Sequence, residues 1–289
     1  MGSVSANWLK GLLLLLCCGS VWAQSAAELR SRFDSVKQQA VSNVFDRPLY
    51  LQSTETSGRM QGDVYALIEH PFAELRQPLA QAKPWCSILI LHLNVKYCRA
   101  AGNGPRDLID VGIGRKFDQP LSSAYWVKFD YRPLVVGDGY LRVELLAPDG
   151  PMGGKDLRIL LEAMTFTPGQ SLLHLTYSYS SGLAARLATQ AYLATLGHDK
   201  VGFSRMGQRE DGPLVGGLRG LLERNTMRYH LAIEAYLDAP ATQQLPQRLQ
   251  GWFSATERYA LQLHEVERQD YIEMKIGEIR RQELEPPPN

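Results

Sequence analysis

A segment near the C-terminus comes closest to a metalloprotease motif. His264-Glu-Val-Glu-Arg268 matches the first half of His-Glu-x-x-His, in which two histidines on one helix face bind zinc and the glutamate acts as a base. The second histidine position is occupied by Arg268, whose positive charge repels a metal ion. Because the remaining histidines are scattered along the chain, we predict no metal site and no cofactor.

Nucleophile and nucleotide motifs are also missing. The sequence has no Gly-x-Ser-x-Gly elbow and no P-loop. Gly112 and Gly114 begin a dinucleotide-like pattern, but Phe117 occupies the position of the third glycine. An enzyme, for instance a hydrolase or a cyclase, is therefore the least favoured of three interpretations.

Two carboxylates lie on polar strand faces. Glu144 and Glu162 each have an arginine nearby in the same expected strands, Arg142 and Arg158. Opposite charges on neighbouring strands pair readily, and such pairs contribute about 0–1 kcal/mol when exposed. We predict ion pairs here, not general acid–base catalysis.

The side chains that could bind a ligand are aromatic. The alternating strand at 171–180 places its tyrosines on one face and His174 on the other. If the long helix packs down fully on the sheet, the aromatic residues simply form the core; if the sheet is strongly curved, they line a cavity for a lipid-like or aromatic ligand. The candidate ligand-binding residues are Tyr125, Phe129, Tyr177, Tyr179, Tyr229, Trp252, Phe253 and Tyr259.

Hydrophobic periodicity predicts a helix followed by an antiparallel meander. Ser25-Ala-Ala-Glu28 has the form of a capping box and begins a helix that ends near Phe45. Short Gly- and Pro-containing breaks separate alternating segments, as between antiparallel neighbours. Segment 87–93 fits either a helix or a strand. The other expected elements are a helix at 72–81 and strands at 49–56, 63–69, 94–99, 108–115, 124–132, 139–147, 157–166 and 171–180.

The region after residue 180 interrupts this meander. An Ala-rich helix at 182–196 and a glycine-rich segment at 207–220 form an insertion, 181–224, which we expect to act as a lid. Alternation then predicts a last strand at 226–237. The chain is expected to end with one long amphipathic helix from Thr242 to Gln282.

The far end of that helix carries a second apolar face. Ile272, Ile276 and Ile279 gather opposite the main stripe, so the helix either bends or packs on something other than the sheet. The first helix is the intramolecular candidate, and a partner protein of the cell envelope is the alternative.

The N-terminus predicts export. Residues 1–23 have a basic Lys10, a short apolar run and a small residue, Ala23, at the expected cleavage site, as in a secretory signal peptide. An uncleaved anchor and a lipoprotein are the alternatives. Without Lys10, Lys and Arg residues equal the 30 Asp and Glu residues, so nothing indicates binding to nucleic acid or to an anionic membrane. We expect a periplasmic or secreted protein with no transmembrane segment after cleavage, a single domain at 24–283 and a disordered tail at 284–289.

Two cysteines remain after cleavage. An even pair in an oxidising compartment favours a disulfide between Cys86 and Cys98. Two separate buried thiols are the alternative.

The order of elements resembles the START-like, or Bet v 1-like, helix-grip (SRPBCC) superfamily. The resemblance covers about 49–180 and 226–275 and includes Asp63-Val-Tyr-Ala-Leu-Ile-Glu69, His70-Pro71-Phe72, a helix ending at Pro84-Trp85 and the terminal helix. The first helix and the insertion depart from the pattern.

The resemblance implies an α+β fold in which a curved antiparallel sheet grips a long C-terminal helix. It also implies a hydrophobic cavity between them. We therefore predict an exported, non-enzymatic protein that binds a hydrophobic small molecule or lipid. The alternative is a cell-envelope scaffold that acts through the end of its last helix.

Overall fold

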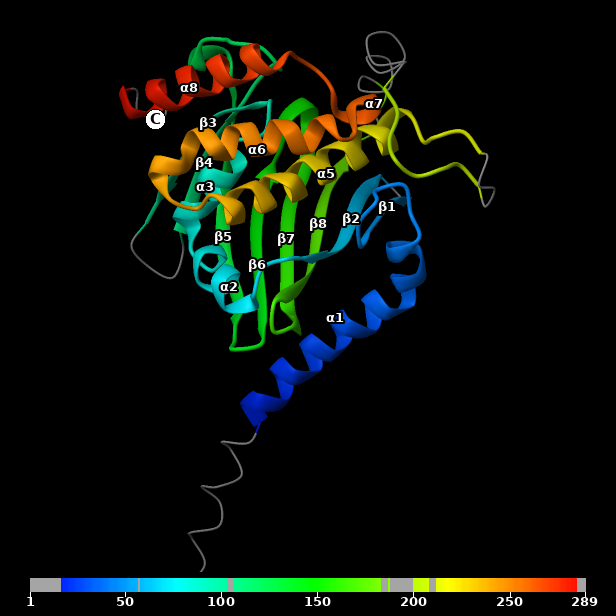
Figure 1. Cartoon of the computed structure of the whole chain (residues 1–289). Coiled ribbons are helices and arrows are strands. Elements are labelled where there is room, and N and C mark those ends of the chain that lie inside the picture. Colours follow the sequence, from blue (N-terminus) through cyan, green and yellow to red (C-terminus); the bar gives the residue numbers. More distant parts are fainter. Residues whose placement is uncertain are drawn as a thin grey trace, which may run out of the picture.

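A computed structural model describes residues 17–56, 58–102, 107–182, 187, 200–207 and 212–284. The centre of the fold is one eight-stranded antiparallel sheet with the order β1-β2-β8-β7-β6-β5-β4-β3. Figure 1 shows its strong curvature. The strands are β1 (Leu49–Thr56), β2 (Arg59–Ile68), β3 (Val95–Ala101), β4 (Asp107–Ile113), β5 (Tyr125–Val136), β6 (Tyr140–Asp149), β7 (Gly154–Thr167) and β8 (Gln170–Ser181).

The topology follows from short connections and one crossover. Strands β3 to β8 form a meander, and the β1–β2 hairpin joins it by pairing β2 with β8. The chain crosses from β2 to β3 through α2 (Phe72–Leu79) and α3 (Ala82–Leu89). The predicted α+β class and curved antiparallel sheet are confirmed, and the ambiguous segment 87–93 is helical through Leu89.

The concave face is covered by α5 (Gly217–Asp238), which crosses β1, β2 and β8 (Figure 1). The predicted strand at 226–237 is therefore wrong, and β8 is the last strand. Apolar residues do alternate there, but the residues between them are buried as well: Arg228 is 2% exposed and His230 is fully buried. A segment buried on every side carries no periodicity that separates helix from strand.

A second helical layer lies over α5. The predicted single helix at 242–282 is wrong, because it is divided into α6 (Leu245–Glu257), α7 (Ala260–Leu263) and α8 (Arg268–Leu284). Helix α6 packs on α5, while α8 packs on β3 and α6. The second apolar face, including Ile272 and Ile276, thus packs against the chain's own core and not against the first helix.

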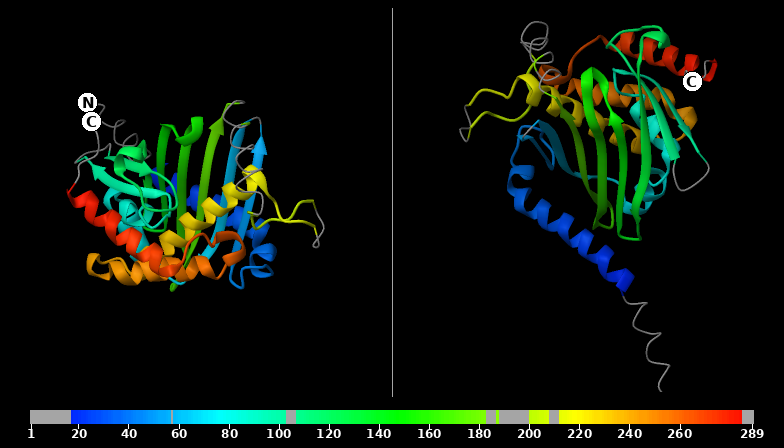
Figure 2. Two further views of the ribbon diagram at one scale, coloured as in Figure 1. Left: turned by 90° about the horizontal axis from the view of Figure 1, so that it is seen from above. Right: turned by 180° about the vertical axis from the view of Figure 1, so that it is seen from behind.

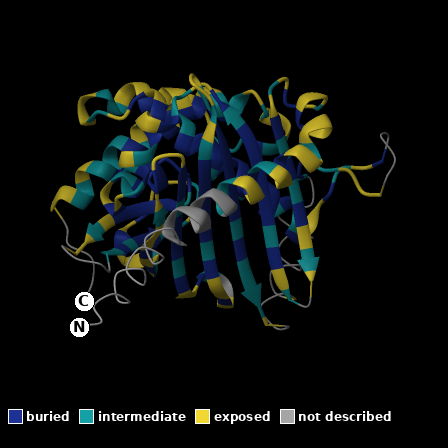
Figure 3. Cartoon of the chain, turned by 90° about the horizontal axis from the view of Figure 1, so that it is seen from below, coloured by how far each residue is buried: buried dark blue, intermediate teal, exposed yellow. Residues whose placement is uncertain are grey.

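The outer, convex face is covered by α1 (Cys17–Val41) (Figure 2, right). Leu29, Phe33 and Ala40 of α1 are fully buried against Tyr65, Tyr140 and Leu172. The sheet is therefore covered by helices on both faces. Figure 3 shows buried residues along the strands that α1 crosses. Part of the sequence lies outside the described residues: 1–16 of the predicted signal peptide, 183–186 and 188–196 of the predicted Ala-rich helix, and 285–289 of the predicted tail.

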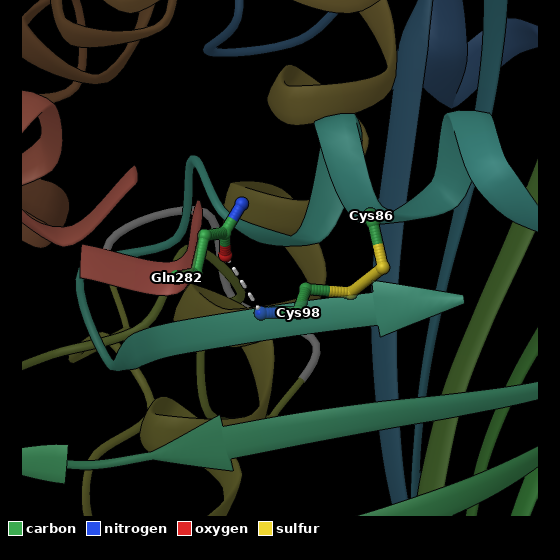
Figure 4. Close-up of a disulfide and its surroundings, with 3 residues drawn as sticks. All are labelled: Cys86, Cys98 and Gln282. Atoms are coloured by element: carbon green, nitrogen blue, oxygen red, sulfur yellow. Dashed lines mark hydrogen bonds between the residues drawn. A yellow bond between two sulfur atoms is a disulfide. The ribbon is translucent and has the colours of Figure 1, made fainter. Parts of the chain in front are cut away.

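A disulfide links α3 to edge strand β3. Cys86 and Cys98 are joined as predicted, with their Cα atoms 5.2 Å apart. The backbone N–H of Cys98 donates a hydrogen bond to Gln282 Oε1 of α8 at 3.1 Å (Figure 4). The bridge therefore joins two consecutive elements, α3 and β3, at a point where the distant helix α8 also contacts β3.

Gly62 of β2 allows α5 to lie close to the sheet. A Cβ atom at this position would collide with Thr226 Oγ1 and come within 3.3 Å of Leu222 Cγ. We expect Gly62→Ala to destabilise the protein by about 1–3 kcal/mol through overpacking. Gly169→Ala is the control, because nothing lies within 4 Å of its Cβ position. Urea unfolding followed by circular dichroism measures both; equal stabilities would contradict this packing of α5.

Removing the disulfide should destabilise the fold as well. A bridge closing a 12-residue separation contributes about 3 kcal/mol by restricting the unfolded chain. We expect the double variant Cys86→Ser/Cys98→Ser to lose about that much in the same assay. Adding dithiothreitol should lower the stability of the wild type but not of the variant. If dithiothreitol does not change the free energy of unfolding of the wild type, the result would argue against the bridge.

Candidate functional site

The eight aromatic residues predicted to bind a ligand are distributed over several places. Tyr125 is 42% exposed on β5, whereas Phe129 is buried in the core. Trp252 and Phe253 of α6 pack against Tyr271 of α8, with ring centroids 5.0 and 5.6 Å apart. These four residues do not form a common surface.

Three of the predicted residues do meet between the sheet and α5. The rings of Tyr177 on β8 and Tyr229 on α5 lie 5.3 Å apart, and Tyr179 lies 6.1 Å from Tyr177. Met60, Leu218 and Leu222 form a small apolar cluster beside them. The structure thus joins a strand and a helix that are separated by some 50 residues of sequence.

These tyrosines are desolvated but not completely buried. Burial raises the pKa of Tyr177 and Tyr229 well above the ordinary value, and it raises that of Tyr179 to about 12. Each of the three residues is nevertheless only partly buried. They form the partly open portion of the layer between the sheet and α5.

A histidine completes this group. His92, in the turn between α3 and β3, stacks on Tyr229 with ring centroids 4.9 Å apart. Its Nδ1 accepts a hydrogen bond from the N–H of Asn94 at 3.1 Å. Within the described part of the chain, the buried Nε2 has no hydrogen-bond partner, although the amide of Asn225 is near enough to influence its pKa.

His92 is held neutral. Burial, followed by the charges of Arg228 and Lys275, lowers its pKa well below the ordinary value. Because Nδ1 accepts a hydrogen bond, the proton of the neutral ring lies on Nε2, which is an unused donor. We call Tyr177, Tyr179, Tyr229 and His92 the tyrosine–histidine cluster. The sequence indicated the tyrosines by strand alternation but carried no signal for His92.

Three open cavities lie elsewhere on the molecule. The largest, about 940 Å³, lies between the α1–β1 connection, β2, α5 and α6 and is lined by Tyr259, Arg47 and Glu234. A second of about 820 Å³ lies beside the disulfide, and a third of about 720 Å³ lies next to α1 on the outer face. Of the predicted ligand-binding residues, only Tyr259 lines one of these three cavities.

The outer face carries a buried charged network. His174 lies between two carboxylates, with Nε2 3.0 Å from Asp63 Oδ1 and Nδ1 2.9 Å from Glu162 Oε2. Arg32 of α1 donates to both oxygens of Glu162 at 2.8 Å, and the hydroxyl of Tyr140 donates to Oε1 at 2.5 Å. Glu162 therefore pairs with α1 instead of a neighbouring-strand arginine, whereas Glu144 pairs with Arg158 at 2.6 Å as predicted.

This network holds its ions in their charged forms. Burial alone would raise the pKa of Glu162, but hydrogen bonds from His174 and Tyr140 outweigh it and lower that pKa to about 2. Burial alone would lower the pKa of His174, but Asp63 and Glu162 raise it. Both ring nitrogens of His174 are paired, so this ring has no donor free for a ligand. Through Arg32 the network fastens α1 to the sheet.

Metal and membrane features are not found in the described part of the chain. No group of three or more His, Cys, Asp or Glu side chains there could hold a metal ion. None of the helices described is long and apolar enough to cross a bilayer.

Comparison with known proteins finds likeness in structure but not in sequence. No protein-family model and no curated protein matches the chain. Among solved structures, norcoclaurine synthase from Thalictrum flavum matches 52% of this chain and 93% of its own, with 11% identity and a TM-score of 0.34. Human StAR-related lipid transfer protein 5 matches 61% and 90%, with 9% identity and a TM-score of 0.32. A STAR-related lipid transfer protein from Xanthomonas axonopodis matches 52% and 88%, with 13% identity and a TM-score of 0.33.

These neighbours are START-type and Bet v 1-like proteins, the superfamily that the sequence resembles. The helix-grip architecture is assigned from the chain's own curved sheet and from α5, which lies in the concave face. No ligand or activity is transferred from these proteins.

The charged network makes a pH-dependent contribution to stability. The pKa of His174 is raised above its ordinary value of 6.5, so its contribution is present below about pH 6.5 and is lost as the pH rises through the folded-state pKa. The pKa of Glu162 is lowered from 4.5 to about 2, so its contribution is present above about pH 4.5 and is lost towards pH 2.

We therefore expect His174→Gln to lower the free energy of unfolding by about 3 kcal/mol, because two buried carboxylates lose a positively charged partner. The decrease should be largest between about pH 4.5 and 6.5. The loss should shrink at alkaline pH. Urea unfolding across this pH range measures it. His70→Gln, at a partly exposed site, is the control. A decrease in the free energy of unfolding that does not depend on pH in either variant would contradict the charged state of His174.

Proposed function

We propose that this chain is an exported protein that binds a hydrophobic small molecule between the curved sheet and α5, at the tyrosine–histidine cluster. One observation carries the proposal. The pKa values of Tyr177 and Tyr229 are raised by burial, although both residues are only partly buried. Side chains that border an interior space have both properties, whereas surface side chains have only the second. Met60, Leu218 and Leu222 would supply the apolar wall.

The chemistry of this group suits binding. Its hydroxyls have raised pKa values and stay protonated at neutral pH, so they can orient a ligand by hydrogen bonds but cannot act as bases there. The donor on His92 is neutral and unused. Export is supported by the N-terminal sequence pattern and fits the Cys86–Cys98 bridge, since disulfides persist in oxidising compartments.

The scaffold alternative has less support. It required a free apolar face at the end of the last helix, but Ile272 and Ile276 are partly buried against the chain's own core. Tyr271 and Lys275 of α8 are fully buried beside them. The surface that the scaffold would use is therefore largely occupied.

Filling the proposed space should block binding. We expect the uncharged fluorescent probe N-phenyl-1-naphthylamine to bind the wild type and to bind Tyr177→Trp about tenfold more weakly, since the larger ring occupies room for the probe. Tyr125→Trp, on an exposed side chain, is the control and should bind as the wild type does. Fluorescence titration measures all three.

Native mass spectrometry of the protein from its own cells gives a second test. A stoichiometric adduct that is lost in Tyr177→Trp would support the proposal. A bare protein that also fails to bind the probe would refute it, and so would equal probe affinity in the wild type and Tyr177→Trp.

A further inference from the structure

One carboxylate near the tyrosine–histidine cluster is shared by several cations. Glu265, between α7 and α8, lies 2.7 Å from Lys116 Nζ, 2.9 Å from Arg228 Nη2 and 3.4 Å from Lys200 Nζ. Its side chain is 6% exposed and that of Arg228 is 2% exposed. A single negative charge thus serves three positive ones in a largely buried place.

A fourth cation has no carboxylate partner in the part of the chain described. Arg224, one helical turn before Arg228 on α5, is 2% exposed. Its Nη1 donates to the backbone oxygen of Val201 at 3.2 Å, and its Nε has no partner. We call Lys116, Lys200, Arg224 and Arg228 the cation cluster.

The neighbouring acid, Glu223, is already occupied by neutral donors. Its Oε1 accepts from the hydroxyl of Ser53 at 2.5 Å, and its Oε2 accepts from the N–H groups of Phe203 and Ser204 at 2.7 and 2.9 Å. With Glu223 counted beside Glu265, four positive charges face two negative ones. The two buried arginines are matched in number by these two carboxylates, so the excess positive charge of the described residues lies at the partly exposed Lys116 and Lys200.

Cations that outnumber the nearby carboxylates favour the binding of an anion, because they donate charge-assisted hydrogen bonds to it. The lowered pKa values of two of these cations agree with this excess. Burial, and then the charge of Arg228, lowers the pKa of Arg224 to about 10. Burial likewise lowers the pKa of Lys116 below its ordinary value, with Arg228 and Lys200 acting in the same direction. The site is thus electrostatically incomplete as built from these residues.

The cation cluster adjoins the tyrosine–histidine cluster. Arg228 immediately precedes Tyr229 on α5, and Arg228 and Lys116 lie near enough to His92 to lower its pKa. The side chains of Lys116 and Lys200 are 38% and 34% exposed, so the cation cluster opens to solvent at its lysine end and is buried at its arginine end. Three buried donor atoms there lack partners: His92 Nε2, Arg224 Nε and Arg228 Nε.

We propose that the cation cluster binds the oxyanion of an anionic amphiphile, a carboxylate or a phosphate, whose apolar body lies against the tyrosine–histidine cluster. The position of the apolar body rests on the proposed function, whereas the oxyanion site rests on the charges themselves. Arginine and lysine donors form charge-assisted hydrogen bonds with such groups, and the oxyanion would supply the negative charge that the described residues lack.

The test compares amphiphiles that share a chain and differ in the head. We expect dodecanoate and dodecyl phosphate to bind the wild type at least about tenfold more tightly than dodecanol, as measured by displacement of N-phenyl-1-naphthylamine. Arg224→Gln should remove most of this advantage and leave the affinity for dodecanol unchanged. Lys155→Gln is the control, because Lys155 is exposed and pairs with Asp149 outside the cation cluster. It should bind all three amphiphiles as the wild type does. Added salt should weaken only the charged ligands.

The outcomes separate the two proposals. Equal affinity of the wild type for dodecanoate and dodecanol would overturn the oxyanion site and leave the apolar function standing; this comparison needs no variant and holds even if Arg224→Gln fails to fold. Binding of none of the three amphiphiles would overturn both. If inorganic phosphate raises the melting temperature while the amphiphiles do not bind, the site takes a free oxyanion and the amphiphile is excluded. Competition of phosphate with dodecanoate but not with dodecanol would support the proposal.

Discussion

Enclosure of α5 is the constraint on which the rest of the molecule depends. The helix lies in the concave face of the sheet and is itself covered by α6, so its side chains have little access to water. Close approach to β2 is possible because Gly62 lacks a Cβ atom. A helix in this position must find a partner for every polar group that it carries, since unpaired buried groups cost free energy.

Some polar side chains of α5 are paired and others are not. Glu234 pairs with Arg47 of the α1–β1 connection, and the hydroxyl of Thr226 donates to the helix's own backbone at Leu222. Buried nitrogen atoms of Arg224, Arg228 and His230 have no partner among the described residues. This stretch of α5 also carries the partly buried Tyr229, so it is the part of the helix that the proposed ligand would contact.

Strands and turns were largely predictable, whereas the layer above the sheet was not. In sequence, strands such as β5 and β8 alternate between apolar and polar residues and are followed by Gly residues, so the local pattern sufficed. The alternation of Met227, Tyr229 and Leu231 pointed to a strand, because burial on both sides of α5 removes the contrast that marks a helix. Likewise, the pairing of Arg32 with Glu162 joins residues 130 positions apart, and no local signal records it.

The helix at the C-terminus has a consequence for self-association. Strand β3 ends the sheet on one side, and an unpaired strand edge is a template for pairing with another chain. Helix α8 packs along β3, and Gln282 accepts the N–H of Cys98, so this edge is occupied by the chain's own last helix. Before residues 268–284 have docked, the β3 edge of the sheet is accessible to strands of other chains, so protection of this edge during folding depends on α8.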